Sequence, residues 1–265
     1  MKKVNLSSYI SDASPIDWEL RTFFKKSNRL VILDIGACEG EDSIRYKRMF
    51  PRATVYSFEP LPYNLSKIKD NFILFGVDDS IEVMPFALSD TEGIATFYVS
   101  SGAPPQKRND ENWNYGNKSS SLLEPATGLK ENYAWLDFLE KIEVKTKRLD
   151  EFWREKDLKQ IDLIHMDVQG AEIKVLEGAG TSLDFVKAIW TEVENVELYK
   201  SQPLKQDVED FMNLHGFIKL ADTVSNVSGD QFYINQKMVS KISIFRYRIL
   251  SSVRHLLNKI QTFLK

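Results

Sequence analysis

An apolar run that ends in an acid and leads into a glycine-bracketed turn most constrains how this chain can fold. Residues 30–33 read Leu-Val-Ile-Leu and are followed by Asp34, and the turn between Gly36 and Gly40 opens a helix near Glu41. A continuous apolar run is typical of a strand buried on both faces of a parallel sheet. A tight strand-to-helix turn needs glycine where the backbone bends sharply or approaches a ligand. The pattern predicts the first unit of a doubly wound α/β fold.

A second expected strand, residues 54–58, ends in Glu59, the position from which an acid binds the ribose hydroxyls of a nucleoside. The turn at 36–41 reads Gly-Ala-Cys-Glu-Gly-Glu and lacks the middle glycine of a dinucleotide fingerprint. Glu39 and Glu41 would also repel a pyrophosphate, whereas they favour a cationic ligand. S-adenosylmethionine, with its sulfonium and amino groups, fits this charge. The alternative is a strand and turn that bind no ligand.

The composition is ordinary for a globular protein. A chain of 265 residues with 43% hydrophobic and 28% charged side chains suits one large α/β domain with appendages. The single cysteine, Cys38, excludes an internal disulfide. The N-terminus has no apolar core of signal-peptide length, and no stretch approaches the roughly 18 apolar residues of a membrane span. These features predict a cytoplasmic protein.

The charge is unevenly distributed along the chain. The formal net charge is −3, but the residues after Gln236 include no acid and carry +7, which leaves −10 for the rest. An acidic body is a poor match for nucleic acid, which requires a basic surface. We therefore expect no nucleic-acid partner.

Alternation of apolar runs with helical patterns predicts successive βαβ units. Strands are expected near residues 30–35, 54–58, 81–87, 161–167, 187–193, 217–220 and 231–235. Helices are expected near residues 41–50, 62–75, 171–178 and 203–215. A hairpin-like pair of strands, near 93–100 and 143–148, brackets a long polar insertion at 101–130.

The chain divides into three expected parts: an N-terminal capping helix region at 1–28, the main domain at 29–236, and a C-terminal helix at 237–265. The insertion at 101–130 places Trp113 and Tyr115 among Asn and Ser residues. Long irregular insertions are typical of lids or of disordered segments, and exposed aromatic side chains favour a substrate-facing lid.

Several segments resemble the FkbM family of S-adenosylmethionine-dependent methyltransferases. They occur in the family's order from about residue 30 to residue 236, and the most specific is Ile-Asp-Leu-Ile-His-Met-Asp-Val-Gln-Gly-Ala-Glu at 161–172. Gln169 stands where the family most often has Glu. The other matching segments are Leu-Asp-Ile-Gly-Ala at 33–37, Phe-Glu-Pro-Leu-Pro-Tyr-Asn-Leu at 58–65, Phe-Ala-Leu-Ser-Asp at 86–90, Thr-Lys-Arg-Leu-Asp-Glu-Phe at 146–152 and Val-Leu-Glu-Gly-Ala at 175–179.

The resemblance implies a class I methyltransferase fold, a Rossmann-like, doubly wound sheet of about seven mostly parallel strands with helical appendages at both ends. It also implies S-adenosylmethionine as the cofactor and a hydroxyl group as the acceptor. The composition of the lid favours a sugar hydroxyl of a glycan or glycolipid precursor. The alternatives are a small metabolite or polyketide-like acceptor, or a non-catalytic, membrane-associated protein that binds the cofactor. The cofactor pocket implied by the family falls on Asp34, Gly36, Glu59, Pro60, Ala87 and Asp167.

Four acids follow the strands expected at 161–167 and 187–193, namely Asp167, Glu172, Glu192 and Glu194. In a doubly wound sheet these strand ends face one crevice. Carboxylates there can act as a general base or hold a hard cation. We therefore predict Asp167 and Glu192 as catalytic residues, and Asp167, Glu192 and Glu194 as ligands of Mg²⁺ or Mn²⁺. The alternative is that these acids hydrogen-bond the cofactor or the substrate without a metal.

His165 is the third candidate catalytic residue. It stands two residues before Asp167 and therefore on the same face of the expected strand. From there it could act as a general base. A lone histidine in a strand is also commonly a core residue with satisfied hydrogen bonds, and both interpretations stay open.

The C-terminal segment 242–265 is expected to form a basic amphipathic helix. Its apolar residues keep to one helical face, and no acid accompanies its cations. Such a helix is typical of a peripheral membrane contact, here at the inner membrane face, or of packing on the body or on a second subunit of a homo-oligomer. The apolar residues of this face are Phe245, Ile249, Val253, Leu256, Leu257, Ile260, Phe263 and Leu264.

Overall fold

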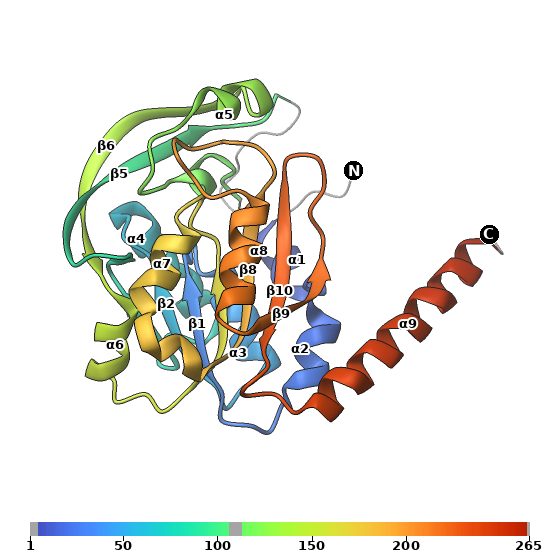
Figure 1. Ribbon diagram of the computed structural model, residues 1–265. Helices are drawn as coiled ribbons and strands as arrows, with labels where there is room; N and C mark the ends of the chain where they lie inside the picture. The colour runs from blue at the N-terminus through green and yellow to red at the C-terminus, as the bar shows by residue number, and fades with distance from the viewer. Residues whose placement is uncertain (1–4, 106–112, 264–265) are drawn as a thin grey trace.

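A seven-stranded sheet forms the centre of the protein (Figure 1). The computed structural model describes residues 5–105 and 113–263, with side chains as far as residue 254. The strand order is β3-β2-β1-β7-β8-β10-β9, and β10 runs antiparallel to its neighbours. This order confirms the predicted doubly wound, mostly parallel sheet. The strands are β1 (Val31–Ile35), β2 (Thr54–Phe58), β3 (Ile81–Met84), β7 (Ile161–Met166), β8 (Val186–Glu194), β9 (Phe217–Asp222) and β10 (Ser228–Asn235).

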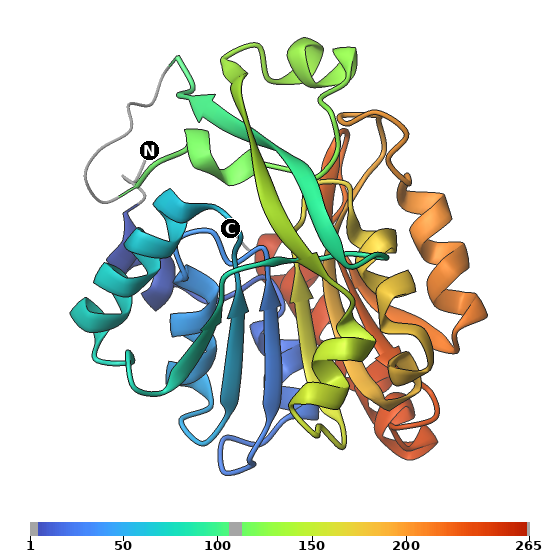
Figure 2. The ribbon, with the colours of Figure 1, turned by 90° about the vertical axis from the view of Figure 1, so that its left-hand side faces the viewer.

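Helices cover both faces of this sheet (Figures 1 and 2). On one face, the N-terminal helices and the first two helices of the main domain bury residues such as Leu20 and Phe72 in one apolar cluster. On the other face, residues such as Phe152 and Met212 belong to a second cluster. The helices are α1 (Leu6–Ser11), α2 (Asp17–Phe23), α3 (Glu41–Met49), α4 (Pro62–Phe75), α5 (Thr127–Asn132), α6 (Leu149–Glu155), α7 (Glu172–Ala179) and α8 (Lys205–Leu214).

The helices expected in the main domain are present, with ends that differ by a few residues. In helix α4, local residues mark both ends: Pro62 stands in the first turn, and Gly76 ends the helix with a left-handed φ of +65°. The expected N-terminal capping helix corresponds to α2. The short helices α1, α5 and α6, each of six or seven residues, were not predicted.

The strand predicted at 81–87 is divided in the structure. β3 ends at Met84, because Pro85 has no N–H for the sheet ladder, and the chain then enters a second sheet. That sheet contains the predicted hairpin-like pair, in longer form, and in Figure 2 the pair crosses over the carboxyl ends of the central strands. Its strands are, in order, β4 (Ala87–Leu88), β6 (Leu136–Lys147) and β5 (Gly93–Gly102).

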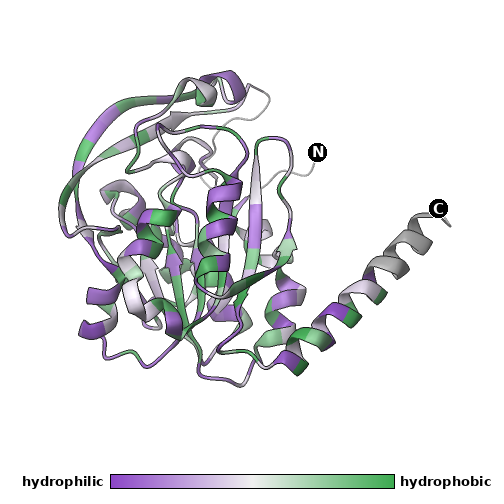
Figure 3. Cartoon of the chain, viewed as in Figure 1, coloured by the Kyte–Doolittle hydropathy of each residue, from purple (hydrophilic) through white to green (hydrophobic). Residues whose placement is uncertain are grey.

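Helix α9 (Lys241–Phe263) extends away from the body (Figure 1). Its first turns are anchored, because Ile244 and Tyr247 are buried and the Tyr247 hydroxyl donates to Glu19 and to the Leu220 carbonyl. Figure 3 shows apolar and hydrophilic residues interleaved along the part of α9 nearest the body. Across the described residues, no helix is long and apolar enough to cross a membrane. The exposed apolar side chains of α9 include Ile242, Phe245, Ile249, Leu250 and Val253.

The turn after β1 provides a stability test. Gly36 has a φ of +83°, and a Cβ there would lie 2.0 Å from the Asp167 carbonyl oxygen, whereas Gly76 has a φ of +65° and open space. Gly76→Ala should cost only left-handed backbone strain, about 1–2 kcal/mol. Gly36→Ala should cost about 1–3 kcal/mol more, because β1 and β7 must move apart. Urea unfolding measures both losses, and equal values would contradict the close contact.

Candidate active site

A cavity of about 180 Å³, called the first cavity here, lies at the carboxyl ends of the central strands. Residues that follow β1, β2 and β7 line it. His165 lines it too, whereas Glu192 and Glu194 do not. The structure thus brings together all the residues predicted to bind the cofactor, which are Asp34, Gly36, Glu59, Pro60, Ala87 and Asp167.

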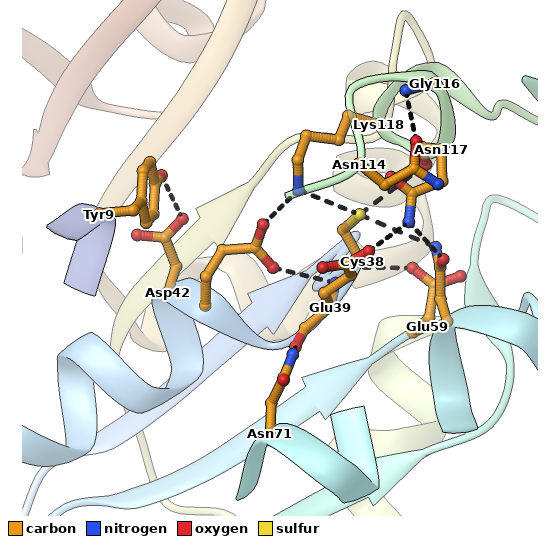
Figure 4. Close-up of polar contacts among 12 residues, drawn as sticks. Tyr9, Cys38, Glu39, Asp42, Glu59, Asn71, Asn114, Gly116, Asn117 and Lys118 are labelled. Atoms are coloured by element: carbon orange, nitrogen blue, oxygen red, sulfur yellow. Dashed lines mark hydrogen bonds and ion pairs between the residues drawn. The ribbon is translucent and has the colours of Figure 1, made fainter. Parts of the chain in front are cut away.

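Glu59 is buried and fixes the turns around it. Its Oε2 accepts the Cys38 N–H at 2.9 Å (Figure 4), and its Oε1 accepts the Leu61 N–H at 2.8 Å. Burial raises the pKa of Glu59 to about 7, although these hydrogen bonds act in the opposite direction. Asn64 also hydrogen-bonds to this carboxylate, so three of its four lone-pair positions are used and one remains for a ligand hydroxyl.

Asp34 and Gly36 join the ends of β1 and β7. Asp34 Oδ2 accepts the Ser43 hydroxyl at 2.6 Å, and Asp34 Oδ1 lies 3.0 Å from Nδ1 of His165. Gly36 lies directly against the backbone of Asp167. A glycine was expected here for a sharp bend or for a ligand, and the structure adds a third reason, the contact between two strand ends.

His165 is packed as a core residue. Its ring stacks on Trp190, with centroids 4.3 Å apart, and packs edge-to-face with Tyr46. Burial lowers the pKa of His165, but the hydrogen bond with Asp34 and nearby carboxylates outweigh burial and raise it to about 9. An imidazolium at neutral pH has no lone pair for another proton. These contacts therefore favour a role in holding Asp34 over the role of a general base.

Gln169 links the two predicted catalytic acids. Its Nε2 donates to Asp167 Oδ1 and to Glu192 Oε2, each at 2.7 Å. Its Oε1 accepts the Tyr199 hydroxyl at 2.9 Å. Glu172, the neighbouring acid, accepts two backbone N–H groups of the turn that carries Gln169. The ends of β7 and β8 are thus held together by one amide, a role that no local sequence signal indicates.

The predicted Mg²⁺ or Mn²⁺ site does not fit this donor set. A cation shared by Asp167 and Glu192 would have to lie between their carboxyl groups, but the Gln169 amide occupies that position and donates to one oxygen of each. Glu194 is 1% exposed, and burial together with Glu172 and Asp167 raises its pKa to about 9, so it is neutral at pH 7. In the described part of the chain, no group of three or more His, Cys, Asp or Glu residues is arranged to hold a metal.

Part of the insertion at 101–130 lies against the first cavity, while its residues 106–112 lie outside the described ranges. The expectation that Trp113 is exposed is wrong, because it is 7% exposed and lines this cavity. Its ring packs on Tyr9 of α1, with centroids 5.0 Å apart. A contact between segments so distant in sequence leaves no local pattern, so the sequence did not indicate Tyr9.

The 3₁₀ helix η1 (Gly116–Ser119) supplies two further cavity residues that the sequence did not reveal (Figure 4). Asn117 Nδ2 donates to Glu39 Oε1 and to Asn64 Oδ1, each at 2.9 Å. Lys118 forms an ion pair with Glu41, and its Nζ lies 4.3 Å from the centre of the Trp113 ring. The insertion therefore contacts the turn after β1 through both a hydrogen bond and a charge pair.

Unpartnered polar atoms and surplus acids in the first cavity fit S-adenosylmethionine. Asn117 Oδ1 and Trp113 Nε1 are buried without a hydrogen-bond partner among the described residues. A bound ligand can supply a donor to Asn117 Oδ1 and an acceptor to the Trp113 N–H. Among the acids that line the cavity, Glu41 is paired with Lys118 and Asp42 with Arg45, whereas Glu59 and Asp167 have no ion-pair partner among the described residues. The remaining acids favour a ligand that carries positive charge.

A strand-turn-helix unit, an acid at the end of the second strand and a cavity above both define a Rossmann-like methyltransferase. The sequence profile of the methyltransferase FkbM domain matches residues 34–219, and this chain belongs to that family. The protein is therefore a methyltransferase, and its fold implies S-adenosylmethionine as the methyl donor.

Individual relatives agree with this assignment. The 2-O-methyltransferase NoeI of Sinorhizobium fredii is 35% identical over 208 residues, which are 78% of this chain and 80% of that protein. Methyltransferase sdnD of Sordaria araneosa is 26% identical over 70% of this chain and 73% of that protein. A crystal structure of methyltransferase FkbM from Methylobacillus flagellatus KT covers 88% of this chain with a TM-score of 0.50 and 12% identity. The match spans 48% of that solved chain, and the likeness shows the fold alone.

Glu59→Ala should weaken binding of S-adenosylhomocysteine by about 1.5–3 kcal/mol, the value of hydrogen bonds to a charged group. Binding to the native protein should tighten as pH rises through about 7, because the ionised carboxylate accepts a ribose hydroxyl more strongly. Isothermal titration calorimetry below and above this pH measures both effects. Glu92→Ala, which removes an exposed acid, is the control. An unchanged dissociation constant in Glu59→Ala would show that another residue holds the ribose.

Proposed function

We propose that this protein transfers the methyl group of S-adenosylmethionine to a sugar hydroxyl of a glycan or glycolipid precursor. The position of Asp167 carries the proposal, because this acid lines both the first cavity and a second cavity beside it. Because Asp167 borders both cavities, it can contact a methyl acceptor in the second cavity while S-adenosylmethionine occupies the first. The relative NoeI is named a 2-O-methyltransferase, which supports oxygen as the acceptor atom.

Methylation of a hydroxyl releases a proton, and Asp167 is the residue placed to accept it. The cofactor would supply an electrophilic methyl group: the hydroxyl oxygen bonds to that carbon as the carbon–sulfur bond breaks and S-adenosylhomocysteine leaves, and the hydroxyl proton passes to Asp167. Burial raises the pKa of Asp167, although its hydrogen bond with Gln169 acts against this, so its carboxylate is a better base than an exposed aspartate. Burial and Asp167 together raise the pKa of Glu192 well above its usual range.

Two alternatives lead to different expectations. A small metabolite or polyketide-like acceptor would use the same base, so only tests with different acceptors separate it from a sugar. A non-catalytic, membrane-associated protein that binds the cofactor would have no need of Asp167 at the boundary between the cavities. Incubating the protein with labelled S-adenosylmethionine and a panel of cell-extracted glycans tests all three, since label would appear in a glycan, in a small product, or in neither.

Asp167→Asn should lower kcat by about 100-fold or more, the usual contribution of a positioned general base. Glu192→Gln should lower kcat less, because Glu192 positions Asp167 through Gln169. Neither change should lower stability, since a carboxyl with a raised pKa destabilises the fold when ionised. Thermal unfolding and methyl-transfer assays measure both quantities.

Glu194→Gln is the matched control for these variants, because it replaces a buried carboxyl group that lines neither cavity. Its activity should equal that of the native protein. Activity should also persist after exhaustive chelation. Full activity in Asp167→Asn, or a loss on chelation that Mg²⁺ or Mn²⁺ reverses, would contradict the assignment of Asp167 as a base that acts without a metal.

We further propose that α9 attaches the protein to anionic membranes, at the cytoplasmic face where lipid-linked glycans are assembled. The support is the exposure of Phe245, Ile249 and Val253 on α9, a helix within residues 237–265, which carry +7 and no acid. Each cation near an anionic surface contributes about 1 kcal/mol. The remaining residues of the predicted apolar face, from Leu256 onward, lie outside the described side chains.

Phe245→Ser with Ile249→Ser should abolish co-sedimentation with anionic liposomes and leave cofactor binding intact. Substitutions are preferable to deletion after Gln236, because deletion would also remove Ile244 and Tyr247, which are buried. Leu139→Ser, at a side chain that is 90% exposed, is the control. If the native protein ignores liposomes and the double substitution instead dissociates a dimer, the face is a subunit contact of a homo-oligomer.

A further inference from the structure

A second cavity, of about 240 Å³, lies beside the first. It lies between η1, α5, the start of β6 and the ends of β7 and β8. The two cavities share Lys118, Asp167 and Gln169 as a common wall. These three residues therefore border both cavities.

The lining of the second cavity combines aromatic rings with carboxyl groups. Tyr133 and Trp135 contribute partly exposed rings. Asp167 and Glu192 contribute partly exposed carboxyl groups, both held by the Gln169 amide. A sugar ring has the complementary chemistry, because the C–H groups on its face pack against aromatic rings and its hydroxyls donate hydrogen bonds to carboxylates.

We propose that the second cavity binds the acceptor as a single neutral sugar ring. The sugar packs on Trp135 and Tyr133, hydrogen-bonds to Glu192, and presents its reacting hydroxyl to Asp167. This inference rests on the proposed function, because it gives a place to the sugar of that reaction. It adds two points to that function: which residues recognise the acceptor, and that the acceptor sugar is uncharged.

The charges around the cavity select a neutral sugar over an acidic one. A uronic acid would add a third carboxylate beside Asp167 and Glu192. Lys118, the cation among the described lining residues, is already paired with Glu41. The Tyr199 hydroxyl does not compensate either, because it donates to the Ser119 carbonyl and to Gln169 Oε1. A sugar with neutral hydroxyls meets no such repulsion.

Binding is measured on the full chain saturated with S-adenosylhomocysteine. The probes are methyl glycosides of neutral hexopyranoses and of hexuronic acids, observed by saturation-transfer NMR. A neutral glycoside should bind and its uronic counterpart should not. Trp135→Ala and Glu192→Gln should each raise the dissociation constant of that glycoside about tenfold or more, the loss of one stacking or charge-assisted contact. The affinity for S-adenosylhomocysteine should not change.

Phe138→Ala is the matched control, because Phe138 belongs to the same apolar cluster as Trp135 and contacts Tyr199 but does not line the cavity. It should bind the glycoside as the native protein does, and Trp135→Phe should recover part of the lost affinity. A loss as large in Phe138→Ala as in Trp135→Ala would overturn the proposal by making the effect structural. Native affinity for the glycoside in both Trp135→Ala and Glu192→Gln would also overturn it.

Methyl-transfer kinetics separate this inference from the function on which it rests. If the native protein methylates a sugar and the variants Trp135→Ala and Glu192→Gln do so with an unchanged KM, the function stands and the placement of the acceptor is wrong. If the native protein binds S-adenosylhomocysteine but methylates no glycoside or extracted glycan, the sugar acceptor is wrong and the inference is wrong with it. A raised KM in both variants supports the placement.

Discussion

The close contact between the ends of β1 and β7 is the constraint on which the site depends. The Asp167 N–H donates to the Ile35 carbonyl at 3.0 Å, and the carbonyl of Asp167 lies against Gly36. Two residues before Gly36 and Asp167 on their respective strands, the side chains of Asp34 and His165 are hydrogen-bonded to each other. Only a glycine permits this approach, since any Cβ at residue 36 would collide with backbone. The same contact places Asp167 at the edge of the first cavity. The contact between Gly36 and Asp167 therefore both packs β1 against β7 and positions the proposed base.

Surplus negative charge is the second property that the site depends on. Burial raises the pKa of Glu59 to about 7 and of Glu194 to about 9, and it also raises the pKa of Glu192 well above the usual range of a glutamate. Without a ligand, these carboxyl groups therefore keep their protons to a higher pH than exposed glutamates would. A cationic ligand lowers the energy of the ionised forms, and it is favoured over the pyrophosphate of a dinucleotide. The preference for a sulfonium compound inferred from Glu39 and Glu41 thus follows from charges that the fold brings close together.

The sequence revealed what depends on local pattern and missed what depends on contacts between distant segments. Apolar runs that end in Asp34 and Glu59 located the central strands and the first cavity, because a buried parallel strand requires such a run. Tyr9 and Lys118 could not be located in this way, since each reaches the cavity from a segment whose position is set by tertiary packing. Trp113 was placed on the surface for the same reason, because a polar neighbourhood in sequence does not show which side chain turns inward.

Gln169 explains why a metal predicted from the acids alone does not fit. Two carboxyl groups as close as Asp167 and Glu192 repel each other when both are ionised, and they need either a cation or a hydrogen-bond donor between them. The Gln169 amide supplies two N–H donors without adding charge, and Tyr199 fixes it from the other side. A glutamate at position 169 would instead add a third carboxylate and restore the need for a cation or an extra proton. Gln169, which stands where the family most often has Glu, is thus the neutral group that lies between the two acids.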